Sequence, residues 1–369
     1  MLSIKIKKSL FCMMILIFSP NVLGNELTLL AHSHGSNAYN KASQNSASFQ
    51  WPTYQKNTEQ NNISDTNLNK SEENTQHFLF PENVHITGKT LDEIILQGIK
   101  NIKENGARFD ARAGSGLQAY DVSYTLLNPQ ERIHWLRIPR STQYFCRELL
   151  AYFKGSLDVS EGLSQASKIW QSLADKNNQV SSNYGYYVFH QRIPECGNLT
   201  QYEWVLKNLE KNLDSRKAFI NINQPHHKNF DSKDFPCTLG MQFFVRNNHL
   251  CCVVSSRSTD IFTGLPYDMG FFSFVTELVY KNLKERLDYP KKEQLNLGYV
   301  TMKTNFTQIY DKTSKQALGL LNTLEKQDKN LYIEPMPSIN DAQETLNDIY
   351  NETQKTPVMK WIHKHANFC

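Results

Sequence analysis

The sequence predicts an α+β fold in which one main, mostly antiparallel or mixed β-sheet is covered by helices. Segments with the apolar spacing of a helix and segments rich in β-branched and aromatic residues are both present. They do not follow the regular βαβ rhythm of a parallel sheet. With 369 residues, 40% of them hydrophobic, the chain is long enough to bury a sizeable core. We expect one folded domain over residues 85–320.

The first 24 residues have the layout of a secretory signal peptide. Three lysines precede the apolar run LFCMMILIF, and the small residue Gly24 follows it. The run is too short to span a bilayer, so we expect no stable membrane insertion. The pattern predicts an exported or secreted protein; the alternative is a cytoplasmic protein whose N-terminus is merely apolar.

Residues 25–84 are rich in Asn, Ser, Gln and Thr and have few large apolar side chains. Such a segment cannot bury enough surface to offset the entropy lost on ordering. We predict a disordered polar linker here, and order beginning near residue 85.

The elements of the domain follow in order from periodicity and turn signals. Helices are predicted over residues 89–106, 144–155, 159–174 and 270–287, the last preceded by a loop at 264–269. Strands are predicted over residues 118–129, 218–223, 241–246 and 249–256. The pair Asn247-Asn248 indicates a hairpin between the last two strands. Residues 321–369 are expected to be a helical extension of the same domain.

The net charge and the cysteines indicate which partners, metals and disulfides to expect. The net charge of +4 is too weak to indicate a nucleic-acid partner, so we expect none. Six cysteines remain after signal removal, without a metal-type CxxC pair, and a chain of this length needs no disulfide framework. We therefore expect no metal site, and we regard every cysteine except Cys237 as an ordinary buried or surface thiol.

Cys237 is distinguished from the other cysteines by the residues around it. Pro236-Cys237 precedes one strand, and the next strand ends in Arg257-Ser258-Thr259-Asp260. A hairpin would bring Arg257 beside Cys237, and a guanidinium lowers the pKa of a nearby thiol. Taken alone, however, a cysteine before a strand is more often a small core residue.

Several motifs together resemble a known family. The stretch from Pro236 to Phe274 resembles the core of thymidylate synthases and pyrimidine-nucleotide (dCMP) hydroxymethylases, with Pro-Cys, Arg-Ser-x-Asp and Gly-Leu-Pro in order. RAGSG at 112–116, RELLAYFKG around Glu148, KIW, NYG and DSRKAFI resemble further segments of the same family. The order holds from about residue 88 to 310.

The resemblance implies a homodimer formed through the sheet, with 5,10-methylenetetrahydrofolate as cofactor and a pyrimidine nucleoside monophosphate as substrate. Cys237 would add to C6 of the base as a thiolate, and Glu148 would relay protons. The 5′-phosphate would be bound by Arg112, Arg257 and Ser258, together with Arg216 and Lys217 of the partner subunit. Base and sugar would be contacted by Asp260, Asp268, Tyr184 and Tyr310, and the folate by Trp170.

Departures from the family pattern bear on substrate and product. Asp268 stands where an asparagine is usual, and a carboxyl group suits the cytosine edge better than the uracil edge. Ser256, Gln308 and Thr238 replace glutamine and two histidines, and the end HKHANFC lacks the usual aliphatic residues. We therefore favour cytidylate hydroxymethylation slightly over dUMP methylation.

A second hypothesis belongs to another class. Nucleoside monophosphates and reduced folates are concentrated in the cytosol, so export argues against an active synthase. The alternative is a secreted, catalytically degenerate nucleotide-binding protein of the same fold.

Overall fold

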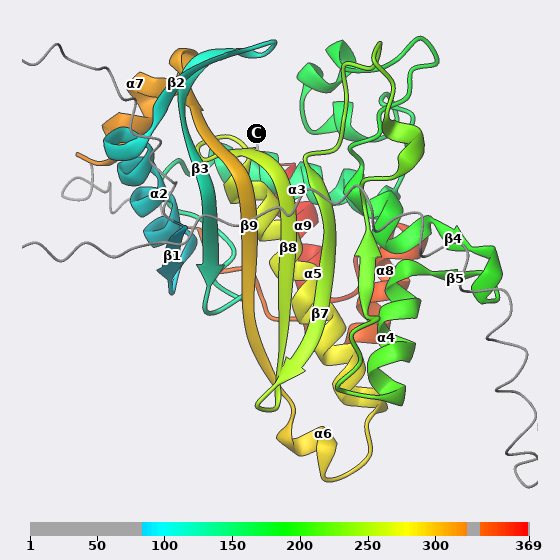
Figure 1. Ribbon diagram of the computed structural model, residues 1–369. Helices are drawn as coiled ribbons and strands as arrows, with labels where there is room; N and C mark the ends of the chain where they lie inside the picture. The colour runs from blue at the N-terminus through cyan, green and yellow to red at the C-terminus, as the bar shows by residue number, and fades with distance from the viewer. Residues whose placement is uncertain (1–82, 323–332, 368–369) are drawn as a thin grey trace, which may run out of the picture. The chain divides into compact units, whose positions relative to one another are not determined.

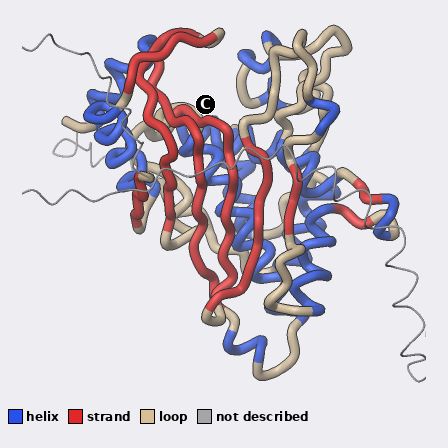
Figure 2. Tube along the Cα trace, in the orientation of Figure 1, coloured by secondary structure: helices blue, strands red, loops and turns tan. Residues whose placement is uncertain are grey.

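A seven-stranded sheet forms the centre of the computed structural model, which describes residues 83–322 and 333–367 (Figures 1 and 2). The strand order is β1-β3-β9-β8-β7-β6, and β2 pairs with β3. β1 with β3 and β8 with β9 are parallel, and the other pairs are antiparallel. The predicted mixed sheet is thus confirmed. The strands are β1 (Val84–Gly88), β2 (Ala107–Ala111), β3 (Gly114–Leu126), β6 (Phe219–Asn221), β7 (Thr238–Arg246), β8 (His249–Asp260) and β9 (Asn296–Tyr310); β4 (Arg192–Ile193) and β5 (Leu199–Thr200) form a separate pair.

Helices pack mainly on one face of the sheet. In Figure 1, α3, α5 and α9 lie behind strands β7, β8 and β9. α5 is buried along most of its length, as expected for an element between the sheet and an outer layer of helices. The helices are α2 (Leu91–Asn105), α3 (Arg140–Lys154), α4 (Gln201–Lys211), α5 (Leu265–Arg286), α6 (Lys291–Gln294), α7 (Asp311–Leu320), α8 (Ala342–Asn351) and α9 (Pro357–Ala366).

Several predicted elements are confirmed, and residues at their ends explain why they form. α2 begins where the Thr90 side chain accepts a hydrogen bond from the backbone of Glu93, and it buries its apolar stripe against the sheet. The predicted hairpin turn joins β7 and β8. Asn247 and Asn248 both have positive φ, 48° and 60°, which asparagine tolerates in this kind of turn.

Two predictions were wrong. The helix predicted over 159–174 is replaced by turns and two short 3₁₀ helices, η1 (Leu163–Gln165) and η2 (Lys168–Ser172). Gly162 has a non-helical backbone there, and the Ser167 hydroxyl caps the backbone of Ile169, so a continuous helix cannot form. The predicted loop 264–269 is already helical, because α5 begins at Leu265 directly after Gly264. Strand β1, before α2, was not predicted.

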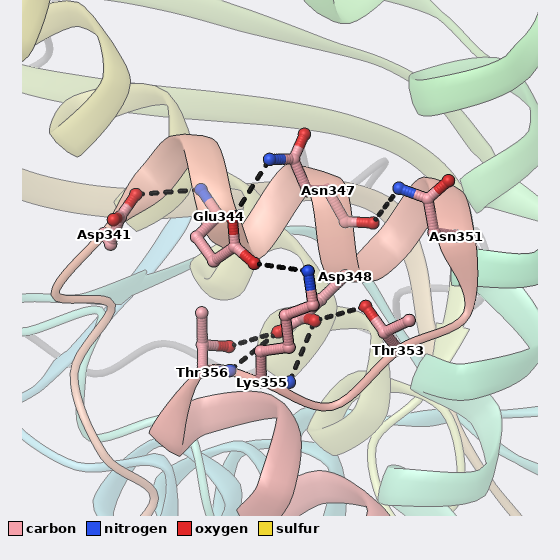
Figure 3. A network of polar contacts seen from close by, with 8 residues as sticks. All are labelled: Asp341, Glu344, Asn347, Asp348, Asn351, Thr353, Lys355 and Thr356. Carbon is pink, nitrogen blue, oxygen red and sulfur yellow. Dashed lines mark hydrogen bonds and ion pairs between the residues drawn. The ribbon is translucent and has the colours of Figure 1, made fainter.

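The C-terminal residues 333–367 form helices that hold α3 in place. The Asp348 carboxylate accepts hydrogen bonds from the hydroxyls of Thr353 and Thr356 and from the backbone of Lys355 and Thr356, which fixes the start of α9 (Figure 3). α9 packs against α3, and Arg147 Nε donates to the backbone oxygen of Ala366 (2.8 Å). The outer side of α3 is thus secured beside the position that carries Glu148.

The predicted signal peptide lies outside the described residues, and so does the predicted linker apart from residues 83 and 84. None of the helices in the described ranges combines the length and apolarity needed to cross a membrane.

Candidate active site

Residues 233–237, which lead into β7, form the centre of the candidate site. Arg112, in the exposed turn between β2 and β3, donates from Nη2 to the backbone oxygen of Lys233 (2.6 Å). Arg257 of β8 donates from Nη2 to the Phe235 oxygen (2.7 Å) and from Nε to the Pro236 oxygen (3.2 Å). The backbone of Arg257 also donates to the Cys237 oxygen (2.9 Å). The β7–β8 hairpin thus places Arg257 beside Cys237, as the sequence pattern predicts.

The Cys237 thiol lies in a half-buried position and contacts the Ser258 hydroxyl, with Oγ and Sγ 3.8 Å apart. Burial raises the pKa of the Cys237 thiol. Arg257 and Ser258 act in the opposite direction, and Asp268 and Asp234 raise the pKa further. The expectation that Arg257 lowers the pKa of the Cys237 thiol below its ordinary value was therefore wrong, because the effect of burial is larger than that of the guanidinium.

Two carboxyl groups share the site with this thiol. Glu148, on α3, is 5% exposed and accepts a hydrogen bond from the Tyr144 hydroxyl (2.8 Å). Burial raises the pKa of Glu148 to about 8, with Asp268 adding to the shift. Asp268 is in the first turn of α5, and burial raises its pKa to about 7. Two neighbouring carboxyls with raised pKa retain protons near neutral pH, as proton transfer requires.

Tyr184 and Trp170 are aromatic groups near these carboxyls. Tyr184 is buried, stacks on Tyr152 with ring centroids 5.6 Å apart, and interacts electrostatically with Asp268 and Cys237. Trp170 lies in η2, half-buried beside Tyr144. Its indole Nε1 is buried and makes no hydrogen bond of normal geometry with any of the described residues, Tyr144 included. A ligand with an acceptor group would satisfy this donor.

Asp260 and Tyr310 end two neighbouring strands, β8 and β9. Asp260 Oδ1 accepts from the backbone of Phe262 (2.8 Å) and Thr263 (2.6 Å), so this carboxylate shapes the turn that leads into α5. The Tyr310 ring lies within electrostatic reach of Cys237 and Arg257.

Gln308, treated from sequence only as a departure from the family pattern, lies next to Asp260 in the parallel β8–β9 register. Gln308 Oε1 and Asp260 Oδ2 are both buried and find no partner in the part of the chain that the structure describes. Two adjacent unpaired acceptors need donors, which water, a protonated Asp260 carboxyl or a bound ligand can supply.

Arg216 and Lys217 are not brought to this site. Both are exposed and precede β6, and the Arg216 backbone oxygen accepts from Gln242 Nε2 (3.4 Å). Gln242 is five positions after Cys237 on β7, about 17 Å along an extended strand. Within one chain, these two basic residues are therefore far from the thiol.

Because Glu148 is buried, we expect the stability difference between wild type and Glu148→Gln to depend on pH. Its pKa in the folded protein lies above the ordinary value of 4.5, so its contribution to stability is full below about pH 4.5 and is lost as the pH rises through 8. Glu148→Gln stays neutral throughout. We expect the free energy of unfolding of this variant, relative to wild type, to rise by on the order of 3 kcal/mol from pH 5 to pH 9. Denaturant unfolding at several pH values measures it.

The exposed Glu161→Gln variant is the control for removing one carboxylate. A difference between wild type and Glu148→Gln that stays constant over this pH range would contradict the buried, protonated state of Glu148.

Comparisons with known proteins identify the family of the chain. The family model described as thymidylate synthase matches residues 94–355, more than half of the chain. Deoxycytidylate 5-hydroxymethyltransferases of Enterobacteria phages T4, T2 and T6 are each 30% identical to it over 146 residues. The matched region is 38% of this chain and 57% of each phage protein. The predicted family and α+β fold are confirmed: the chain belongs to the thymidylate synthase family.

Proposed function

We propose that the protein transfers a one-carbon unit to C5 of a pyrimidine nucleoside monophosphate, with cytidylate hydroxymethylation favoured. The observation that carries the proposal is a chain of groups: Arg257 and Asp268 both act on the Cys237 thiol, and Asp268 in turn acts on Glu148, the second carboxyl group with a raised pKa. A thiol nucleophile beside groups that hold protons near neutral pH suits covalent catalysis coupled to proton transfer.

Cys237 would act as the nucleophile. Its thiolate forms a bond to C6 of the base, the C5–C6 double bond opens, and C5 becomes nucleophilic. Because burial raises the pKa of the resting thiol, Arg257 and Ser258 matter as the groups that favour the thiolate. Glu148, held by Tyr144, would take up and return protons through water.

Arg112, Arg257 and Ser258 would bind the 5′-phosphate, since guanidinium groups and hydroxyls are suited to phosphate oxygens. Both arginines already contact residues 233–237, so phosphate binding would act directly on the backbone that presents Cys237. The buried acceptors of Gln308 and Asp260 and the hydroxyl of Tyr310 would face the sugar and base.

The proposed cofactor is 5,10-methylenetetrahydrofolate, which supplies the one-carbon unit when bound. Trp170 fits a flat aromatic ligand, because its ring is half-buried beside Tyr144 and its indole N–H lacks a well-formed hydrogen bond among the described residues. Trp170 would orient the ligand, and its neighbours would exclude water from it.

Asp268 supports the preference for cytosine. In its protonated form the carboxyl donates to ring N3, and its other oxygen accepts from the exocyclic amino group of cytosine. Burial raises the pKa of Asp268 to about 7, so the protonated form is well populated at neutral pH. The name of the phage relatives, deoxycytidylate 5-hydroxymethyltransferase, agrees with this choice.

The base preference can be tested with dCMP and dUMP, methylenetetrahydrofolate and chromatographic analysis of the product bases. Wild type is expected to convert dCMP to 5-hydroxymethyl-dCMP, and Asp268→Asn to lose about tenfold or more in kcat/KM for dCMP relative to dUMP, since one mispaired buried group costs about 1–3 kcal/mol. Cys237→Ser should form no product. An unchanged base preference in Asp268→Asn would refute the role of Asp268. Nucleotide binding without product from either substrate would instead support the degenerate binding protein.

A second copy of the chain would complete the phosphate site. The backbone oxygen of Arg216 contacts Gln242, which lies five positions beyond Cys237 along the chain, roughly 17 Å in an extended strand, and both basic residues are exposed. The strands also expose Tyr120, Leu239 and Phe306, each 39–41% accessible. In Figure 1, α3, α5 and α9 lie behind the sheet, which leaves its front face free of these helices. We propose a homodimer formed through this sheet face, with the two basic residues reaching the partner's site.

Subunit mixing tests the shared site. Cys237→Ser and the double variant Arg216→Ala/Lys217→Ala are each expected to be inactive. After unfolding and refolding together in equal amounts, they should recover about a quarter of wild-type activity, because half of the dimers carry one intact site out of two. Recovery of no activity, with dimers present by sedimentation, would show that the basic residues do not act across subunits.

A further inference from the structure

Asp234 joins two loops that come from distant parts of the chain. It lies three positions before Cys237 and is 6% exposed. Its Oδ2 accepts from the backbone of Ser181 (2.6 Å) and Ser182 (2.8 Å), and its Oδ1 accepts from the Ser182 hydroxyl (2.5 Å). Ser182 in turn lies two positions before Tyr184. One carboxylate therefore couples the segment that carries Cys237 to the segment that carries Tyr184.

Hydrogen bonds around Asp234 hold its side chain and both loops in place. Ser232 Oγ donates to the Asp234 backbone oxygen (2.6 Å), and the Tyr187 hydroxyl donates to the Ser181 oxygen (2.9 Å), so both loops are held on each side of the carboxylate. With three donors directed at it, the Asp234 side chain is already bound within the protein. With three bound donors and little exposure, Asp234 is suited to positioning the two loops rather than to contact with a substrate.

The charge of Asp234 works against the reactivity of Cys237. It is one of the groups that raise the pKa of the thiol, whereas Arg257 lowers it. The negative charge of Asp234 therefore does not activate the thiol, since losing this charge would increase the thiolate fraction of Cys237. Any benefit of Asp234 to the reaction must come from geometry.

We infer that Asp234 is a positioning residue that sets Cys237 and Tyr184 relative to each other, so that the thiol meets C6 of a base held against the tyrosine. The inference rests on the proposed function. Misplacing a reacting group by about 1 Å can cost on the order of 100-fold in rate. The hydrogen bonds between Asp234 and residues 181–182, which we call the clamp, can therefore have a large effect on the rate.

Four forms of the full-length protein test the inference: wild type, Asp234→Asn, Ser182→Ala and the control Asp231→Asn. Asp231 is an exposed aspartate in the same loop. Two rates are measured. The first is alkylation of Cys237 by iodoacetamide over a pH series, located by peptide mass spectrometry. The second is tritium release from C5 of whichever 5-tritiated nucleotide the wild type accepts, which requires addition of Cys237 at C6.

Asp234→Asn should change the two rates in opposite directions. We expect alkylation at pH 7 to rise about two- to fivefold, because the thiolate fraction increases while Arg257 and Asp268 are unchanged. We expect tritium release to fall about tenfold or more through kcat, because the clamp is weakened. Ser182→Ala keeps the carboxylate, so it should slow tritium release with alkylation near the wild-type value. Asp231→Asn should match wild type in both.

Tritium release that rises together with alkylation, or that is unchanged in Asp234→Asn, would overturn the inference. If wild type releases no tritium, the proposed function fails, and hydrogen exchange then tests the clamp by itself. The amides of Ser181 and Ser182 should exchange faster in Asp234→Asn than in Asp231→Asn. Equal exchange in these two variants would overturn the inference in that case too.

Discussion

The guanidinium of Arg257 is the group on which the rest of the site depends. Its side chain donates to the backbone oxygens of Phe235 and Pro236, and its backbone donates to that of Cys237. Buried carbonyl groups need such partners, so one side chain both fixes the entry to β7 and places a positive charge beside the thiol. The β7–β8 hairpin makes this contact possible.

The site combines groups whose charged forms are disfavoured by burial. Glu148 and Asp268 have raised pKa values, and the Cys237 thiol shifts in the same direction. These groups destabilise the fold when they ionise, because the surrounding protein excludes water from them. The C-terminal helices are part of this surrounding protein: the Asp348 network fixes α9, α9 holds α3, and α3 carries Glu148. A segment remote from the chemistry thus supports the position of a proposed proton carrier.

Much of the fold could be predicted from local patterns, because the signals for α2, α3 and the β7–β8 hairpin lie within the elements themselves. The helix predicted over residues 159–174 was wrong, because the apolar spacing suggested a helix whereas Gly162 and Ser167 interrupt the helical backbone. The contact of Arg257 with Cys237 could be inferred from the hairpin. Asp234 and Tyr144 were missed, since their roles depend on tertiary contacts: Asp234 meets Ser182, 52 positions away. The raised thiol pKa was missed for the same reason, because burial cannot be read from neighbours in sequence.

The proposed chemistry requires that Cys237 form the covalent bond to the nucleotide. Intact-protein and peptide mass spectrometry can detect this bond after incubation with methylenetetrahydrofolate and 5-fluoro-dCMP or 5-fluoro-dUMP, because fluorine at C5 blocks release of the adduct. We expect one nucleotide and one folate attached per reacting site, with the modified peptide containing Cys237. Absence of an adduct with both nucleotides, or an adduct at another residue, would disprove the assignment of Cys237 as the nucleophile.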